Sequence, residues 1–268
     1  MRRCSAPHAL ATLQPPAADS LIPLLAPLSP SAQTDGRGRA LARLQAEIGG
    51  CRACERAGYL SRAQPLARVR GPATARVMIV GQAPGRLTIE RNLMFGGPSG
   101  DALERWLQLA GFAPGALRRE VYLSALTRCD PGRSEKGKGD RKPSPAEVAL
   151  CRPWLERELA LVRPRVILLV GGMAIEAFIG RVKLGDVVGS ALERDGVTLI
   201  PLPHPSGVSR WLNEPAHQAM LRHGLERLAQ LRAAWEAEER ADETGAIPAR
   251  QHDNTKMSQL SQEMLKHE

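Results

Sequence analysis

Apolar residues recur along this chain in two patterns. Four short and almost uninterrupted apolar runs predict buried β-strands. These runs span residues 76–80, 121–126, 166–170 and 197–202. Helical spacing of apolar residues predicts helices over residues 38–48, 99–111, 145–161, 172–180 and 214–232. Continuous apolar strands that alternate with helices are typical of a parallel sheet covered on both faces. We therefore predict an α/β fold, a three-layer α/β/α sandwich with a central four-stranded parallel sheet.

The loops that follow the predicted strands hold the candidate chemistry, because such sheets bind ligands beyond the carboxyl ends of their strands. The first loop reads Gly81-Gln82-Ala83-Pro84-Gly85. Two glycines and a proline set a tight turn, which lets main-chain N–H groups approach a bound group closely. An ordinary strand-to-helix turn accounts for the same residues, so both interpretations stay open.

An aromatic residue and a histidine lie in two further loops. Phe95 belongs to the glycine-rich segment 92–100, just before a predicted helix. A ring flanked by glycines has little local core to join, so stacking on a ligand and plain packing are both open. His204 stands between Pro203 and Pro205 after the fourth apolar run. Two prolines exclude a helix there, so a rigid loop presents the imidazole, and we expect a functional role for it.

The composition predicts a folded chain and suggests that it binds a polyanion. The 268 residues are 43% hydrophobic, which excludes a disordered or collagen-like protein. No stretch approaches the roughly 20 apolar residues of a membrane span, and no signal peptide is recognisable. The net charge is +9. We expect a cytoplasmic, nucleoid-associated protein without a membrane partner.

The charge is distributed unevenly and suggests three regions. Residues 1–36 are neutral and rich in Ala, Pro and Ser, which predicts a flexible N-terminal arm. Residues 233–268 carry −4 and predict a mobile C-terminal tail. The middle, residues 37–232, therefore holds +13 and forms the predicted folded domain. A basic folded domain favours a nucleic-acid partner.

Five cysteines, an odd number, favour a metal or cluster site in a reducing compartment over a disulfide framework. Cys51 and Cys54 form a C-x2-C pair, whereas Cys129 and Cys151 are scattered. Four thiolates complete either a tetrahedral zinc site or a [4Fe–4S] cluster, and the scattered second pair favours iron–sulfur. Plain burial of Cys129 and Cys151 is the alternative. Cys4, in the predicted arm, is a bystander.

Six ordered motifs carry a resemblance to a known family. They are C-x2-C at 51–54, GQAPG at 81–85, F-GG-SG at 95–100, VYLSALTRC at 121–129, CRPWL at 151–155 and HPS at 204–206. In this order, over roughly residues 39–230, they resemble the uracil-DNA glycosylase superfamily, closest to its Fe–S-containing fourth family. The resemblance implies a four-stranded parallel sheet between helices and excision of a damaged base with no metal at the reaction centre. It also implies a structural [4Fe–4S] cluster, held by Cys51, Cys54, Cys129 and Cys151.

The resemblance also implies roles for individual residues. His204 and Gln82 are the expected catalytic residues, and Phe95 stacks on the flipped base. The base-binding set comprises Gly81, Gln82, Phe95, Ala125 and His204. The DNA-binding set comprises Ser206, Gly207 and Arg210, with Val208 or Arg210 entering the gap that the base leaves.

Three departures from the family pattern change the expected chemistry. Gln82 stands where the fourth family has Glu, and Ala83 follows it, so this motif supplies no carboxylate base. Ala125 stands where the family has the Asn that reads the uracil edge. We expect Thr127, on the same strand face, to replace that reader in part. The basic loop 130–144 is similar to the loop of a branch that is covalently trapped on uracil, but contains no histidine, so trapping is not expected.

We predict a monofunctional DNA glycosylase that hydrolyses the N-glycosidic bond of uracil or a related deaminated base after base flipping. Its partner is DNA containing a damaged base, and a monomer is expected. The rival from another class is an Fe–S protein that recognises damaged or single-stranded DNA without excision. The alanines at positions 83 and 125 favour the rival, whereas Phe95 and His204 favour the enzyme. A zinc-stabilised nucleic-acid adaptor is the third interpretation.

Overall fold

The computed structural model describes residues 21–24, 34–66, 71–134, 139–206 and 210–243. The chain divides into two compact units, Met1–Ala229 and Gln230–Glu268. The sheet, both candidate sites and all helices before α9 belong to the first unit. Helix α9 (Pro215–Glu243) begins in the first unit and ends in the second.

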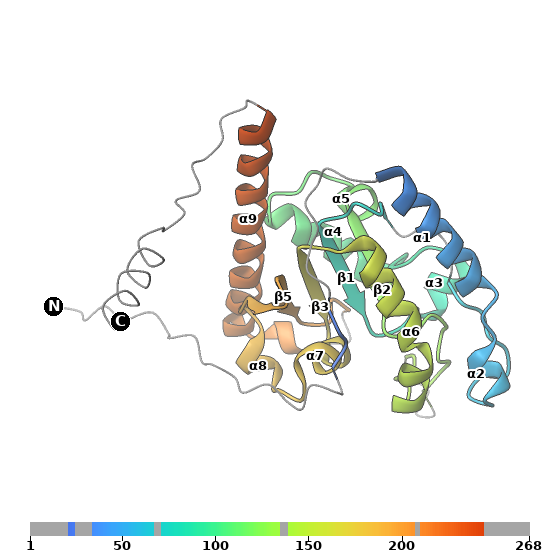
Figure 1. The fold of residues 1–268 in the computed structure, drawn as a ribbon. Coiled ribbons are helices and arrows are strands. Elements are labelled where there is room, and N and C mark those ends of the chain that lie inside the picture. The colour runs from blue at the N-terminus through green and yellow to red at the C-terminus, as the bar shows by residue number, and fades with distance from the viewer. Residues whose placement is uncertain (1–20, 25–33, 67–70, 135–138, 207–209, 244–268) are drawn as a thin grey trace, which may run out of the picture. The chain divides into compact units, whose positions relative to one another are not determined.

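A five-stranded sheet forms the centre of the first unit (Figure 1). Its spatial order is β2 (Val121–Ala125), β1 (Val77–Gly81), β3 (Val166–Val170), β5 (Val197–Leu202) and β4 (Leu192–Arg194). The first four strands are parallel, as predicted. The edge strand β4 pairs antiparallel with β5 and was not predicted. Three residues with an exposed Glu193 at the centre carry too little apolar signal to mark a strand.

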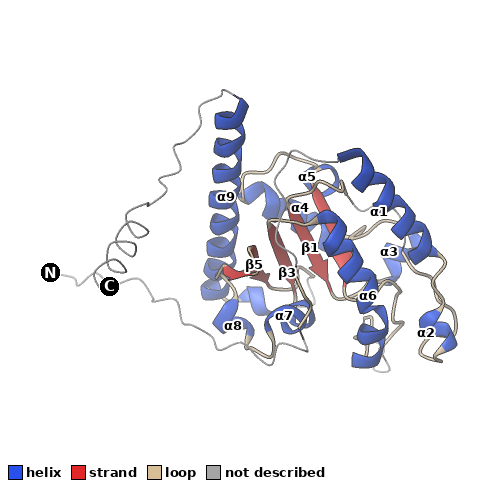
Figure 2. Cartoon of the chain, in the orientation of Figure 1, coloured by secondary structure: helices blue, strands red, loops and turns tan. Residues whose placement is uncertain are grey.

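Helices cover both faces of the sheet (Figure 2). Helices α1 and α6 lie over one face, with α4 and α5 over the other. The helices before α9 are α1 (Thr34–Gly49), α2 (Ala53–Arg56), α3 (Arg86–Glu90), α4 (Pro98–Leu109), α5 (Ala116–Arg119), α6 (Pro145–Val162), α7 (Gly172–Ile179) and α8 (Leu184–Val187), with a 3-10 turn, η2 (Trp211–Asn213). The predicted α/β/α sandwich is therefore confirmed.

The core explains why the strands read as continuous apolar runs. Met78 and Val80 of β1 join a hydrophobic cluster that includes residues of α1, α6 and α7. Val77 and Ile79 point to the opposite face and are equally buried. Every residue of the four parallel strands is buried. A sheet covered on both faces leaves no position for an exposed polar residue.

The N-terminal arm predicted for residues 1–36 needs a correction. Ile22 and Leu24 are buried, and the Ile22 N–H donates to the Ala177 carbonyl at 3.2 Å. The Arg152 guanidinium also donates to the Leu21 carbonyl at 2.7 Å. Two apolar side chains in four residues suffice to hold this segment on the core. Helix α1 begins at Thr34, three residues before the predicted start of the folded domain at residue 37.

The predicted C-terminal tail also begins too early. Helix α9 extends to Glu243, so residues 233–243 are helical. This stretch is rich in Ala and Glu, which are strong helix formers, and its negative charge masked that propensity. Within the described ranges, no helix has both the length and the apolar character that a membrane crossing requires.

Candidate active site and cysteine site

The turn after β1 lies directly beside the end of β2. Gly81 pairs in register with Ala125. Beyond the strands, the Leu126 N–H donates to the Gly81 carbonyl at 3.0 Å and the Thr127 N–H to the Gln82 carbonyl at 3.3 Å. Three of the predicted base-binding residues, Gly81, Gln82 and Ala125, are thereby brought together at the carboxyl edge of the sheet. Gln82 is half-buried, whereas Ala125 is fully buried.

The Phe95 ring lies against the end of β1. A Cβ atom built on Gly81 would lie 3.0 Å from Phe95 Cζ. Phe95 has a φ of 52°, a left-handed conformation that costs energy for a residue with a side chain. The Arg118 guanidinium donates to the carbonyls of Met94 and Phe95 and so holds this backbone. The half-buried ring therefore belongs to the same site as Gly81 and Gln82.

His204 follows β5 and has a defined protonation pattern. The Ser206 N–H donates to its Nδ1 at 3.2 Å, and Ser206 Oγ lies 2.8 Å from the same atom. A backbone N–H can only donate, so Nδ1 is the acceptor and the neutral ring carries its proton on Nε2. Burial lowers the pKa of His204, which keeps the imidazole neutral at pH 7.

The loop after β3 packs against the His204 ring. Gly171 has a φ of 86°, which a glycine adopts without strain, and its N–H donates to the Leu202 carbonyl at 2.9 Å. A Cβ atom on Gly171 would lie 3.3 Å from His204 Cδ2. Because β5 is the second neighbour of β1 in the sheet, His204 lies on the same carboxyl edge as Gln82.

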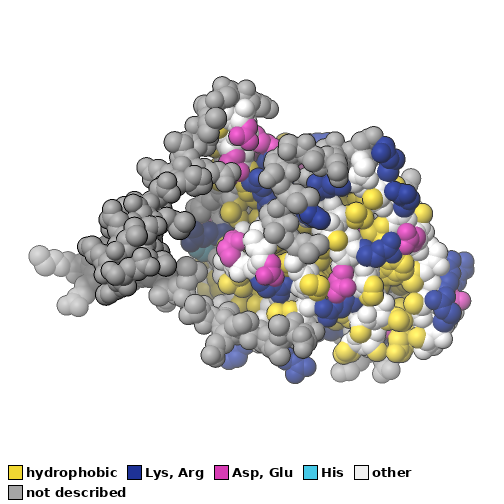
Figure 3. Space-filling model, in the orientation of Figure 1, with side chains coloured by type: hydrophobic (Ala, Val, Ile, Leu, Met, Phe, Trp, Pro, Cys, Tyr) yellow, Lys and Arg dark blue, Asp and Glu magenta, His cyan; other side chains and the backbone are white. Residues whose placement is uncertain are grey.

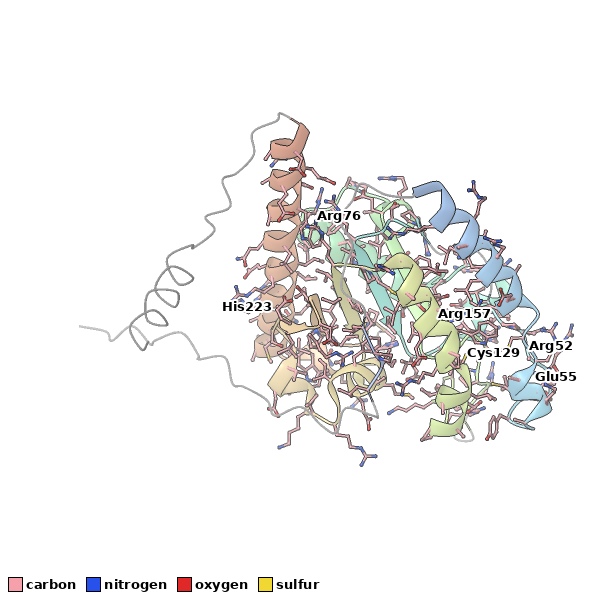
Figure 4. The ribbon with its side chains drawn as sticks, viewed as in Figure 1. Arg52, Glu55, Arg76, Cys129, Arg157 and His223 are labelled. Atoms are coloured by element: carbon pink, nitrogen blue, oxygen red, sulfur yellow. The ribbon has the colours of Figure 1, made fainter. Side chains whose placement is uncertain are left out.

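The four predicted metal-ligating cysteines line one cavity. Cys51 precedes α2 and Cys54 lies within it, Cys129 follows β2, and Cys151 is buried in α6. Figure 4 shows Cys129 between α6 and α2. Within the described part of the chain, no group of three or more His, Cys, Asp or Glu residues is arranged to hold a metal ion. The cavity nevertheless brings together four cysteines from three separate segments of the chain.

The thiols of this cavity influence one another electrostatically. Burial, followed by the charges of the neighbouring cysteines, raises the pKa of Cys54 to about 11 and that of Cys129 to about 12. Burial also raises the pKa of Cys151, against a lowering effect of Arg128. The thiols of Cys54, Cys129 and Cys151 therefore resist joint ionisation unless positive charge enters the cavity.

A buried hydroxyl also lines this cavity. Thr127 is 4% exposed, and its Oγ1 has no hydrogen-bond partner among the residues that the structure describes. A buried hydroxyl without a partner is costly, which fits a cavity that receives a group with acceptor atoms. Thr127 therefore lies beside the cysteines, on the chain that continues from Ala125.

Comparisons with known proteins identify the family of the chain. The family model of the uracil DNA glycosylase superfamily matches residues 69–235. The chain belongs to this superfamily. It is 30% identical over 179 residues to a Type-4 uracil-DNA glycosylase of Pyrobaculum aerophilum, covering 63% of this chain and 85% of the relative. It is 34% identical over 151 residues to the Type-4 enzyme of Archaeoglobus fulgidus (52% and 69%) and 29% over 187 to a Type-5 enzyme of P. aerophilum (58% and 78%). The predicted resemblance is confirmed.

The predicted DNA-binding residues of this superfamily member lie in the loop after His204. Ser206 is half-buried and bonded to His204, and Arg210 is exposed. Gly207 and Val208 lie outside the described residues. Trp211 stacks on His217 with ring centroids 4.0 Å apart, which anchors the far end of the loop. Figure 3 shows Lys and Arg side chains spread over the visible face, with hydrophobic side chains between them.

Sequence reasoning missed a buried ion pair that connects the two sites. Arg128 Nη2 lies 2.7 Å from Glu158 Oε2, and both side chains are almost fully buried. The Ser124 hydroxyl donates to the same carboxylate at 2.5 Å, and Arg128 donates to the Ala125 carbonyl. The available signal was the position of Glu158, a charged residue at the helical spacing of buried positions on α6.

Proposed function

We propose that the protein is a monofunctional DNA glycosylase, which hydrolyses the N-glycosidic bond of uracil or a related deaminated base in DNA. The names of its Type-4 and Type-5 relatives support uracil as the reference substrate. One observation carries the proposal. His204 is neutral, its Nδ1 is already occupied as an acceptor, and its Nε2–H remains as a donor at the carboxyl edge of the sheet.

His204 would act on the leaving base. Cleavage of the glycosidic bond leaves an oxocarbenium-like sugar and an anionic base. A donor held at a pyrimidine carbonyl stabilises charge that develops mainly in the transition state. Because the ring is neutral and held by Ser206, Nε2–H stabilises the anion without a reorganisation step. Loss of such a donor costs about 10²–10³ in rate.

The other residues of the site would hold the flipped base. Extrusion of the base costs a few kcal/mol, which a pocket must return through stacking and hydrogen bonds. Phe95 would stack on the base, and Gln82 with the Gly81 main chain would contact its edge. Ala125 offers only a methyl group where the family has an amide, so discrimination between uracil and other deaminated bases is expected to be weak. Ser206, Gly207 and Arg210 would contact the DNA backbone.

The four cysteines would hold a structural [4Fe–4S] cluster, which supplies positive charge to the buried thiolates and ties their segments together. The convergence of Cys51, Cys54, Cys129 and Cys151 on one cavity supports this ligand set. The unpartnered Thr127 hydroxyl supports a bound group with acceptor atoms. No step of the base excision passes through these residues.

A base-release assay tests the enzymatic proposal. Oligonucleotides containing uracil, hypoxanthine, xanthine or a normal base are incubated with enzyme, and abasic sites are cleaved with alkali. We expect release of uracil or another deaminated base, with at least a 100-fold slower single-turnover rate for His204→Ala. His223→Ala is the matched control, since His223 is exposed on α9 (Figure 4). DNA binding without base release would support the rival binding protein instead.

Metal analysis tests the cluster. The purified protein should absorb visible light at about 400 nm and contain iron and sulfide. Cys151→Ser should lose this absorbance, whereas Cys4→Ser should keep it. Zinc without iron would identify the site as tetrahedral zinc and would refute the cluster.

A further inference from the structure

The turn 81–85 supplies no carboxylate of its own, but a carboxylate from another segment lies on it. A Cβ atom built on Gly85 would lie 2.6 Å from Asp140 Oδ2. Asp140 also accepts the backbone N–H of Arg86, the first residue of α3. Asp140 comes from the loop between β2 and α6, more than fifty positions along the chain from Gly85. The fold therefore delivers a carboxylate to a motif that lacks one.

The position of Asp140 is built by contacts on both sides. Asp140 forms an antiparallel bridge with Arg133, and the Arg141 N–H donates to the Gly132 carbonyl at 2.8 Å. The Arg141 guanidinium donates hydrogen bonds to both carboxylate oxygens of Glu147, each at 2.7 Å. Glu147 is in turn fixed by a capping box at the start of α6. The carboxylate is thus held by the backbone before it and by a bidentate ion pair after it.

The charges around Asp140 leave it a usable base. Partial desolvation of its carboxyl group and the neighbouring carboxylate of Asp130 raise its pKa. The Arg86 N–H and the cations Arg86 and Arg133 oppose this effect. A carboxylate with a raised pKa accepts a proton more readily than an ordinary aspartate. Asp140 is exposed, so a sugar and a water molecule can reach it.

We propose that Asp140 is the carboxylate that positions and deprotonates the attacking water, a catalytic role that rests on the proposed glycosylase function. The water oxygen forms a bond to the anomeric carbon as the bond from that carbon to the base nitrogen breaks. The electron pair of the broken bond leaves with the base, where His204 stabilises the charge. The water proton passes to Asp140 and later to solvent or to the departed base.

A purely structural role makes a different prediction. Asp140 could serve only as the cap of α3 through the Arg86 N–H. Asparagine accepts such a hydrogen bond about as well as aspartate, but it cannot take a proton. Asp140→Asn therefore keeps the cap and removes the base. Asp186→Asn is the matched control, because Asp186 is exposed on the distant helix α8.

The test is single-turnover excision of uracil by the wild type, Asp140→Asn, Asp140→Ala and Asp186→Asn between pH 4 and 9. We expect Asp140→Asn to be about 100-fold slower with an unchanged melting temperature. The wild-type rate should fall at acidic pH as Asp140 is protonated, whereas the Asn variant should lose this limb. An Asn variant as fast as the wild type, with only the Ala variant impaired, would show that Asp140 is merely a cap. A wild type that releases no base would overturn the glycosylase proposal itself, and this inference with it.

Discussion

Gly81→Ala tests the contact on which the base site depends. A methyl group at this position would lie 3.0 Å from Cζ and 3.6 Å from Cε1 of Phe95. Gly81 has no left-handed φ, so alanine fits its backbone, and the effect comes from the ring alone. The Phe95 backbone cannot retreat, because Gly100 lies against its carbonyl and Arg118 holds it. The ring must therefore turn away by a few tenths of an ångström.

The expected cost follows from stacking energies. Stacking of a base on an aromatic side chain is worth about 1–3 kcal/mol. If displacement of the ring removes about 1.4 kcal/mol of this, the single-turnover rate falls about tenfold. The folded state should lose about 1 kcal/mol, at the lower end of overpacking costs, because the ring is only half-buried and can yield.

Rapid-quench excision and thermal melting measure the two effects separately. Gly172→Ala is the matched control, since a Cβ atom there meets nothing within 4 Å and the residue begins α7. The control should match the wild type in rate and melt at the same or a slightly higher temperature. If Gly81→Ala excises uracil as fast as the control, Phe95 does not stack on the base, and the proposed placement of the base against the Phe95 ring is wrong.

Two further substitutions test the supports of the sites. Glu147→Gln should lower the free energy of unfolding, measured in urea at pH 7, by about 2–3 kcal/mol. The reason is that hydrogen bonds from the Arg141 guanidinium lower the pKa of Glu147 from 4.5 to about 2. A depressed pKa stabilises the fold above about pH 4.5 and ceases to do so as the pH falls through 2, so the two proteins should converge in acid. Arg118→Met should slow excision about tenfold with little effect on DNA binding, because the carbonyls of Met94 and Phe95 each lose a hydrogen bond from Arg118 that holds the strained backbone of Phe95.

Much of the fold could be predicted from the sequence, because the spacing of apolar residues indicates which positions are buried. The runs at 76–80 and 166–170 became β1 and β3 within one residue. The prediction was wrong in two segments whose overall composition suggested an arm or a tail, although their residues are buried or favour a helix. Residues 21–24 lie in a Pro- and Ala-rich stretch yet are held on the core by Ile22, and residues 233–243 form helix despite their charge.

The candidate site was accessible only in part. Motif order along the chain indicated Gln82, Phe95, His204 and the four cysteines. Gln82 and His204 follow strands, and the topology gathers the ends of those strands at one edge of the sheet. The approach of Asp140 to Gly85 depends instead on the path of an irregular loop. No periodic pattern indicates such a path, and an aspartate in a basic loop is indistinguishable from solvated charge.

The connection from β2 to α6 links the cysteine cavity to the proposed base site. Ala125, a predicted base-binding residue, ends β2, and three residues later the Arg128 side chain donates to the Ala125 carbonyl and to Glu158. The Arg128 backbone donates to the sulfur of Cys151, and Cys129 is the next residue. The same connection then carries Asp140 to the turn after β1 and ends in the capping box of α6. A group bound by the four thiols would hold Cys129, four residues after Ala125, and Cys151, in the helix that follows the connection. It would therefore fix the two ends of the connection that carries Asp140, which predicts an effect of the cysteines on excision through position alone.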